Sequence, residues 1–315
     1  MSDSRGRTVL IVNPMSANGS LGRRWPEISS IIRRGVAFDE VRTQGPGDAT
    51  WLTREALEAG ASCVVAIGGD GTINEVVNGF FDGDRPVAPE ASMGVLPFGT
   101  GGDFRKTIHL PRDLERSAAI LARGVTRRID VGMLDYTTRD GDTETRVFAN
   151  IASFGISGLV DRLVNESSKA LGGRLSFLLA TARASVRYQN QRVRLVFDED
   201  EANPVEMTIN TVAVANGRYF GGGMYIAPKA ELDDGRFDVV ALGDLSTKDF
   251  LVHGRRIYNG THLGIDKVSY RRAQVVRAEP LGGESIELDV DGETPGVLPA
   301  TFRIVPAALS LVVPG

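Results

Sequence analysis

Short apolar runs alternate with amphipathic segments over the first part of the chain. Four runs have the length of buried strands, and helical spacing of apolar positions predicts three helices between them. The strands are predicted at 8–12, 38–42, 63–67 and 92–96, and the helices near Trp25, at 49–60 and at 72–80. Strands that alternate with helices are typical of a parallel, doubly wound α/β sheet. In such sheets ligands bind at the carboxyl ends of the strands.

The pattern changes near Arg128, after which strand-like runs dominate and one long helical segment, at 158–188, interrupts them. The predicted strands lie at 128–134, 145–152, 193–197, 208–215, 238–242, 267–276, 285–290, 301–305 and 309–313. We therefore predict an α/β domain over residues 1–128, completed by a C-terminal strand within 306–315. A β-rich second domain is predicted over residues 129–305.

Composition narrows the class of protein. A formal net charge of -4 argues against a nucleic-acid binder that relies on overall charge. The one cysteine, Cys63, cannot form an internal disulfide, which fits a cytoplasmic protein. No run approaches the roughly 20 apolar residues that span a bilayer, so a lipid substrate would be met at the membrane surface.

A glycine-rich turn follows the third predicted strand, in the sequence AIGGDGTINE at 66–75. Glycines bring backbone N–H groups close to an anion, and the helix that follows adds the positive end of its dipole. A simple tight turn would also use glycines, but Asp70 points to function, because a carboxylate repels phosphate unless it handles a metal, a water or a proton. The chain lacks a Walker motif and a complete GxGxxG, which disfavours those two nucleotide sites.

A second glycine-rich turn, LPFGTGGDF at 96–104, follows the next predicted strand. Its loop should emerge at the same edge of the sheet. One such turn is weak evidence for a ligand site. Two on one edge, carrying Asp70 and Asp103, are stronger.

GGDGTINEV at 68–76, PFGTGGDF at 97–104 and the Asn13-Pro14 loop resemble the diacylglycerol kinase catalytic family. That family includes bacterial YegS-like lipid kinases, sphingosine kinases and ceramide kinases. The resemblance implies an NAD-kinase-like nucleotide domain followed by a β-sandwich-like domain. It also implies that ATP is bound by Asn13, Thr43, Gly68, Gly69, Asp70, Gly71, Thr72, Ile73, Asn74, Thr100 and Asp103. Gly102 departs from the family pattern, in which this position is usually Asn.

The resemblance continues into the second half, through VANGRYFGGGM at 214–224 and AELDDGRFDV at 230–239. Taken alone, the Asp-Asp-Gly sequence is most often a turn. The resemblance makes Asp234 a ligand of Mg²⁺, with the backbone carbonyls of Glu231 and Arg236 as further donors. Oxygen donors of this kind suit hard cations.

A last motif, DGE at 291–293, follows a predicted strand. By pattern alone Glu293 is a carboxylate in a turn. By resemblance it accepts the proton of the lipid hydroxyl, while Asp70 orients this network or shares the role of base. The three histidines are scattered, and no Ser-His-Asp or Cys-His arrangement competes.

These features predict an ATP- and Mg²⁺-dependent lipid kinase, with diacylglycerol as the default acceptor. Three alternatives stay open: a ceramide or sphingoid-base kinase, an NAD-kinase-like enzyme with a soluble substrate, and a catalytically silent nucleotide-binding regulator. Peripheral binding to a membrane is expected, and the mixed basic and apolar segment at 167–179 is one candidate surface, although an ordinary helix that covers the second domain fits the same pattern. Since relatives often form dimers, a homodimer is a further expectation.

Overall fold

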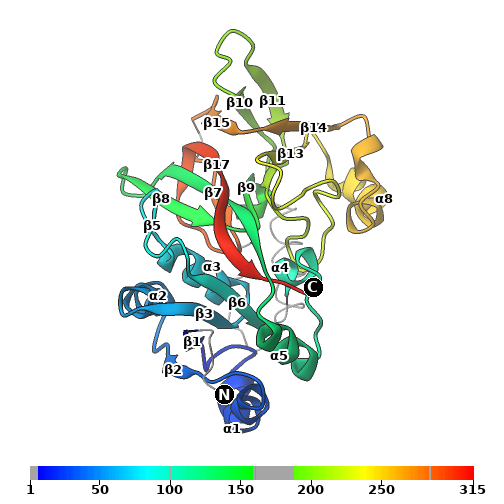
Figure 1. Ribbon diagram of the computed structural model, residues 1–315. Helices are drawn as coiled ribbons and strands as arrows, with labels where there is room; N and C mark the ends of the chain where they lie inside the picture. The colour runs from blue at the N-terminus through cyan, green and yellow to red at the C-terminus, as the bar shows by residue number, and fades with distance from the viewer. Residues whose placement is uncertain (1–5, 100, 159, 161–187, 284) are drawn as a thin grey trace. The chain divides into compact units, whose positions relative to one another are not determined.

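The computed structural model describes residues 6–99, 101–158, 160, 188–283 and 285–315 (Figure 1). Two compact units divide the chain: Met1–Asp130 with Pro306–Gly315, and Val131–Val305. The boundaries expected from the sequence, after residues 128 and 305, lie close to these. The long helix expected at 158–188 falls almost entirely outside the described residues.

The first unit is built on a parallel sheet, as the alternation of strands and helices predicts. Its strand order is β17–β6–β3–β1–β2, and each neighbouring pair runs parallel. The strands are β1 (Arg7–Val12), β2 (Asp39–Arg42), β3 (Ala61–Gly68), β6 (Ser92–Pro97) and the C-terminal part of β17 (Val297–Val312). The far end of the chain therefore supplies an edge strand of this sheet.

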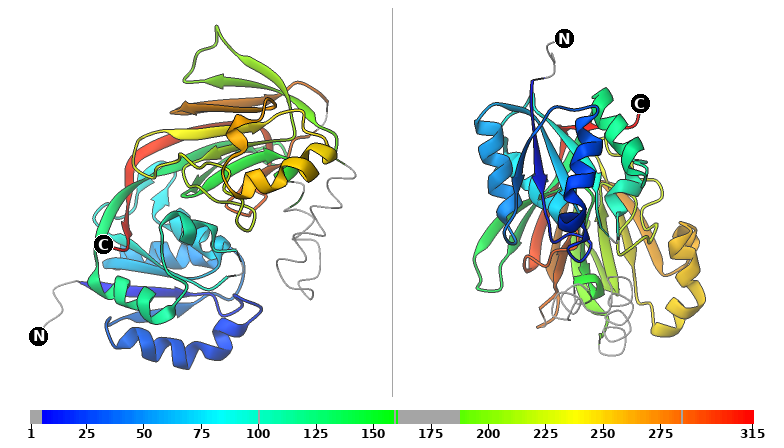
Figure 2. Two further views of the ribbon diagram at one scale, coloured as in Figure 1. Left: turned by 90° about the vertical axis from the view of Figure 1, so that its right-hand side faces the viewer. Right: turned by 90° about the horizontal axis from the view of Figure 1, so that it is seen from below.

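Helices cover both faces of the parallel sheet. Helices α1 (Ser20–Arg33) and α5 (Leu114–Arg123) lie on one face, and α2 (Asp48–Glu58) and α3 (Asp70–Gly79) lie on the other (Figure 2). Apolar residues of α1 at helical spacing, Leu21, Trp25, Ile28 and Ile32, pack into one core with strand residues of β1, β3 and β6. The unit also holds the short helix α4 (Asp103–Thr107) and a small hairpin, β4 (Phe81–Asp82) with β5 (Arg85–Pro86).

The second unit contains a five-stranded antiparallel sheet in the order β14–β13–β12–β9–β16. Its strands are β14 (Val268–Ala273), β13 (Phe237–Leu242), β12 (Thr211–Ala215), β9 (Ile151–Gly155) and β16 (Leu288–Val290). The facing strands are β11 (Val205–Ile209), β10 (Gln191–Phe197), β15 (Val275–Pro280) and the N-terminal part of β17, with the hairpin β7 (Thr126–Thr137) and β8 (Thr143–Phe148) paired to β17.

The main core of the second unit lies between these two layers. Side chains alternate across a strand, so Val212 and Val214 of β12 face this core, and Ala213 and Ala215 face the opposite side. Stacked phenylalanine rings fill the space between the layers; the Phe148–Phe237 centroids, for example, are 5.7 Å apart. This arrangement is the β-sandwich-like domain that the family resemblance implies.

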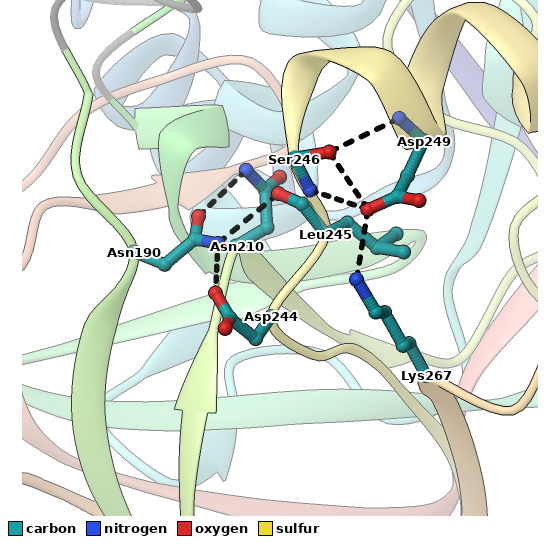
Figure 3. A network of polar contacts seen from close by, with 7 residues as sticks. All are labelled: Asn190, Asn210, Asp244, Leu245, Ser246, Asp249 and Lys267. Carbon is teal, nitrogen blue, oxygen red and sulfur yellow. Dashed lines mark hydrogen bonds and ion pairs between the residues drawn. The ribbon is translucent and has the colours of Figure 1, made fainter.

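Helix α8 (Thr247–Tyr258) covers the outer face of the five-stranded sheet, where its Ile257 packs against residues of β12 and β13. The sequence analysis did not predict this helix. Its start is set by a capping box, in which Ser246 and Asp249 bond to each other's backbone, and Lys267 donates to Asp249 at 2.9 Å (Figure 3).

Three runs expected as single strands are each two strands, separated at Ala149–Asn150, Asn210 and Gln274. The polar side chains at these breaks form hydrogen bonds that are not part of the ladder between the strands. Asn210 donates to the side chain of Asn190, which in turn donates to Asp244 at 2.7 Å (Figure 3). Conversely, the two strands expected at 301–305 and 309–313 form one strand, β17, which continues through Pro306.

Candidate functional site

The first glycine-rich turn joins β3 directly to α3. Gly69 precedes the helix, its carbonyl accepts from Ile73 N at 3.0 Å, and Asp70 is the first helical residue. A Cβ atom at Gly68 would lie 2.5 Å from Thr72 Oγ1, so only glycine fits beside this helix. The first N–H groups of a helix have no intrahelical acceptor, which makes the start of a helix suitable for binding an anion.

The second glycine-rich turn touches the first, backbone against backbone. Phe98 N donates to Gly68 O at 2.6 Å. A Cβ atom at Gly99 would lie only 2.8 Å from Gly69 Cα. The two turns predicted to share one edge of the sheet therefore do so, and glycine is required for their contact.

Asp70 fastens this contact, since its Oδ2 accepts from Gly102 N at 2.8 Å. Gly102 has a φ of 65°, in the left-handed region that glycine and asparagine adopt most readily. The glycine at the family's usual Asn position therefore preserves the backbone geometry, and what it lacks is the amide side chain.

The other nucleotide residues expected in the first unit lie around these turns. Asn13 Nδ2 donates to Thr72 Oγ1 at 2.9 Å, which links the loop after β1 to α3. Thr43 is buried after β2, and its N donates to Val12 O. Ile73 and Asn74 are buried, so their contribution to a ligand would come from the backbone. Thr100 lies outside the described residues.

Glu75 is a residue of this site that the sequence analysis missed. Its carboxylate accepts from Gly47 N at 2.9 Å and from Ala49 N at 3.0 Å. It thus ties the loop that carries Thr43 to helix α3. The position of Glu75 five residues after Asp70 on α3 was visible in the sequence, but its partners lie 26 to 28 residues earlier in the chain.

Two cations beside the second turn were also missed. Asp103 is buried and pairs with Lys106 Nζ at 2.7 Å. Burial, with a smaller contribution from Arg112, lowers the pKa of Arg105, and the charges of Asp70 and Asp103 oppose that shift. Positive charge at this edge suits a polyphosphate, and the DFRK sequence of α4 is the signal that places it there.

In the second unit, Asp234 lies in the turn before β13. Its Oδ1 accepts from Arg236 N at 3.0 Å, and its Oδ2 forms an ion pair with Arg272. Glu231 and Arg236 are exposed on either side of it. Asp234 is a carboxylate donor of the kind that hard cations prefer, and it already has a cationic partner in Arg272. Within the described ranges, no cluster of three acidic, histidine or cysteine side chains forms an all-side-chain metal site.

A second carboxylate, Asp238, stands next to this turn on β13 and is fully buried. It pairs across the strands with Arg272, whose Nε lies 3.8 Å from Asp238 Oδ2. Burial raises the pKa of Asp238, while Tyr270 and Arg272 act in the opposite direction. The sequence analysis assigned this aspartate no role.

Glu293 lies in a tight turn after β16, closed by two backbone bonds between Val290 and Glu293 of 2.8 and 3.0 Å. Two aspartates, to which the sequence analysis assigned no such role, hold this turn in place by hydrogen bonds. Asp291 Oδ1 accepts from Ile151 N at 2.8 Å, and the buried Asp289 accepts from Gly292 N at 2.9 Å. The backbone at Glu293 is therefore fixed by its neighbours.

Two family models match most of the chain. Residues 7–134 match the diacylglycerol kinase catalytic domain. Residues 150–313, just over half of the chain, match the YegS C-terminal NAD kinase beta sandwich-like domain. The chain belongs to the diacylglycerol kinase catalytic family of lipid kinases, which are phosphotransferases.

This lipid kinase is similar to its relatives over almost its whole length. A diacylglycerol kinase from Mycobacterium tuberculosis is 29% identical over 311 residues, which cover 98% of this chain and 96% of that protein. A diacylglycerol kinase from Staphylococcus carnosus is 28% identical over 299 residues, covering 95% and 92%.

Solved structures agree on the fold of the lipid kinase. A diacylglycerol kinase from Bacillus anthracis has a TM-score of 0.71 at 18% identity and covers 99% of this chain and 98% of its own. Yeast NADH kinase complexed with NADH has a TM-score of 0.52 at 11% identity, covering 99% and 85%. The predicted NAD-kinase-like domain with a following β-sandwich-like domain is thereby confirmed.

Proposed function

We propose that this lipid kinase transfers the γ-phosphoryl group of ATP to the free hydroxyl of diacylglycerol and so produces phosphatidic acid. Relatives that share 28 and 29% of their residues with it over 95 and 98% of the chain are named diacylglycerol kinase. The observation that carries the nucleotide half of the proposal is the contact of the two glycine turns, fastened by the bond between Asp70 and Gly102.

In this proposal the backbone of residues 68–74 cradles the phosphates at the start of α3, and Asn13, Thr43, Thr100 and Asp103 provide further contacts to the nucleotide. Lys106 and Arg105 lie beside the second turn and would offset phosphate charge. Phosphoryl transfer requires little covalent chemistry from the protein, so positioning and charge neutralisation account for most of the catalysis.

Glu293 is proposed as the acceptor of the lipid hydroxyl proton, supported by its DGE motif and by its fixed turn. Asp70 orients this network or shares the role of base. Mg²⁺ would be held by the Asp234 carboxylate and by the backbone carbonyls of Glu231 and Arg236, where a hard cation supplies charge neutralisation. The ion pair of Asp234 with Arg272 supports the attraction of this turn for cations.

The test is transfer of labelled phosphate from ATP to a panel of acceptors: diacylglycerol, ceramide and sphingoid base in mixed vesicles, and soluble NAD. The proposal expects labelled phosphatidic acid as the main product. If ceramide, sphingoid base or NAD is the labelled product instead, the proposed function is replaced by a kinase of that acceptor.

Two variants separate chemistry from binding. Glu293→Gln should lower kcat by about 10²- to 10⁴-fold, the usual contribution of a general base, with ATP affinity unchanged. Glu206→Gln, at an exposed strand position paired with Arg192, is the matched control and should keep wild-type turnover. ATP binding with wild type and Glu293→Gln equally inactive would instead favour the silent nucleotide-binding regulator.

Peripheral membrane binding is the second part of the proposal. Among the helices that the structure describes, none is long and apolar enough to cross a bilayer. The segment at 167–179 lies outside the described residues, so support comes from α8. Lys248, Val252 and Arg255 share one exposed helical face, with Val252 72% exposed. Lys267 Nζ lies 2.9 Å from Oδ2 of Asp249, the acidic residue of this helix, and offsets its charge.

Co-sedimentation with phosphatidylglycerol vesicles tests the α8 surface. Lys248→Glu combined with Val252→Asp should weaken binding at least about fivefold, since each basic residue near an anionic surface contributes roughly 1 kcal/mol. Arg116→Glu, an exposed charge reversal on α5, should leave binding unchanged. If the Lys248→Glu, Val252→Asp double variant binds vesicles as well as Arg116→Glu does, the α8 surface is rejected.

A further inference from the structure

Arg272 lies between two carboxylates of the second unit and contacts each through a different nitrogen. Its Nη2 forms the ion pair with Asp234, and its Nε lies 3.8 Å from Asp238 Oδ2. The exposed fractions of the three side chains differ widely: 40% for Arg272, 21% for Asp234 and 0% for Asp238. The guanidinium thus reaches from solvent to a fully buried charge.

Asp238 has no freedom to leave this arrangement. It is the second residue of β13, directly opposite Arg272 in the antiparallel register with β14. Its side chain points to the same side of the sheet as Val240 and Leu242, which pack beneath α8. A carboxylate at such depth requires a nearby cation or hydrogen-bond donors, and Arg272 is the cation that the strand register brings to it.

Asp234, in contrast, lies in a turn and holds its own backbone in place. Its Oδ1 accepts from Arg236 N, and its Oδ2 takes the guanidinium. A metal ion at Asp234 needs this second oxygen or must approach past the guanidinium. Two cations that claim one carboxylate oxygen compete.

We propose that Arg272 is the resident counter-ion of Asp234 and that it exchanges with the divalent cation. When the ion arrives, Nη2 releases Asp234, and Arg272 is retained by Asp238 on the neighbouring strand. Asp238 is then a positioning residue, which keeps the displaced guanidinium close enough to return. This inference rests on the metal site of the proposed function.

The exchange is tested by titration of the full chain with MgCl₂ in the absence of nucleotide, followed by calorimetry and by thermal shift. Arg272→Met removes the competing charge and keeps an unbranched side chain. Its Mg²⁺ affinity should rise by up to about fivefold, the range expected for release of a partly exposed ion pair.

Arg271→Met is the matched control on the same strand. The Arg271 guanidinium lies over the Phe197 ring at 4.5 Å, on the other side of β14 from Arg272. This variant loses the same charge one residue away from Arg272, on the opposite face of the strand, and its Mg²⁺ affinity should equal that of the wild type. A rise equal to that of Arg272→Met would indicate a general field effect and overturn the exchange.

Asp238→Asn should lower the Mg²⁺ affinity, the opposite of the change expected for Arg272→Met. Without the Asp238 carboxylate, Arg272 remains on Asp234. Removal of a nearby negative charge would by itself also weaken cation binding, so the double variant decides between the two causes. If Asp238 acts through Arg272, Asp238→Asn weakens Mg²⁺ binding in the wild type and has no effect in Arg272→Met. Equal weakening in both backgrounds would overturn the proposal.

Failure of the exchange and failure of the proposed function give different results. Unchanged affinity in Arg272→Met, with measurable binding by the wild type, rejects the exchange and leaves the metal site intact. No Mg²⁺ binding by the wild type or any variant rejects both the exchange and the metal site. Phosphoryl transfer to lipid is judged separately, from the labelled product.

Discussion

At the scale of single residues, Asp70 combines a structural bond with a proposed chemical role. Its carboxylate accepts from Gly102 N at 2.8 Å and so joins the two glycine turns. The sequence predicted a functional role for Asp70, because a carboxylate in a phosphate-binding turn would otherwise repel the ligand. It could not predict the bond, because the partner amide lies 32 residues further along the chain.

Two substitutions at Asp70 should separate these roles. Asp70→Ala leaves the Gly102 amide without this acceptor and should lower the free energy of unfolding by about 1–3 kcal/mol. Asp70→Asn retains an oxygen that can accept, so its loss of stability should be smaller, while turnover falls in both variants. Urea denaturation measures the first effect and labelled-phosphate transfer the second. Wild-type stability of Asp70→Ala would show that the bond contributes nothing.

His262 is a second residue with a measurable signature. It is fully buried, its Nε2–H donates to Ile226 O at 2.9 Å, and burial lowers its pKa. The folded protein therefore binds this proton less readily than the unfolded chain, whose histidine pKa is about 6.5. The stabilisation is present above about pH 6.5 and is lost as the pH falls from there towards the lower folded pKa.

His262→Gln keeps a donor for Ile226 O and removes the titration. Between pH 7.5 and 5.5 the wild type should lose more unfolding free energy than this variant, a difference in slope that urea denaturation measures at roughly half-unit steps of pH. The exposed His109, replaced by Gln, serves as the control and should follow the wild type. Parallel pH profiles for wild type and His262→Gln would contradict the shift.

At the scale of elements, apolar patterns predicted β1, β3 and β6 of the first unit because each has a buried, unbroken run. They failed where a polar residue interrupts an apolar run, as at Asn210, whose side chain bonds to Asn190. They also missed α8, although Ser246 and Asp249 stand at the spacing of a capping box. The hydrogen bond at Asn210 joins residues distant in the chain, so no local pattern predicts it. The capping box, in contrast, is a local pattern that the sequence contains.

The contact of the two glycine turns provides the prediction at this scale. In Gly99→Ala the new methyl group would meet Gly69 Cα at 2.8 Å, and backbone cannot give way as a flexible side chain can. We expect a loss of about 1–3 kcal/mol in unfolding free energy, together with weaker ATP binding. Gly45→Ala is the control, because no heavy atom of the described residues lies within 4 Å of its added Cβ. Urea denaturation and calorimetric titration with ATP measure both effects, and wild-type behaviour of Gly99→Ala would show that the turns do not need this contact.

At the scale of the whole molecule, the chain leaves the first unit after Asp130 and returns to it at Pro306. Asp130 is almost fully buried, and its Oδ1 accepts from Ala307 N at 2.7 Å, which joins the departing and returning segments. The apolar run at 309–313 predicted a strand from the sequence. Its parallel pairing with β6 depends on partners more than 200 residues earlier in the chain, and no local pattern contains that information.

Strand β17 therefore serves two cores, and substitutions along it should act on different units. Leu311 is fully buried opposite Met93 in the first unit, and Phe302 is fully buried against Phe154 in the second. Leu311→Ala should cost about 2–5 kcal/mol and accelerate amide hydrogen exchange in β6 and β3. Phe302→Ala should cost about 3–5 kcal/mol and accelerate exchange in β15 and β9. Each variant is the control for the other. An identical exchange pattern in both would mean that the two units unfold only as one. Undisturbed exchange in β6 after Leu311→Ala would mean that the first unit does not need the returning strand.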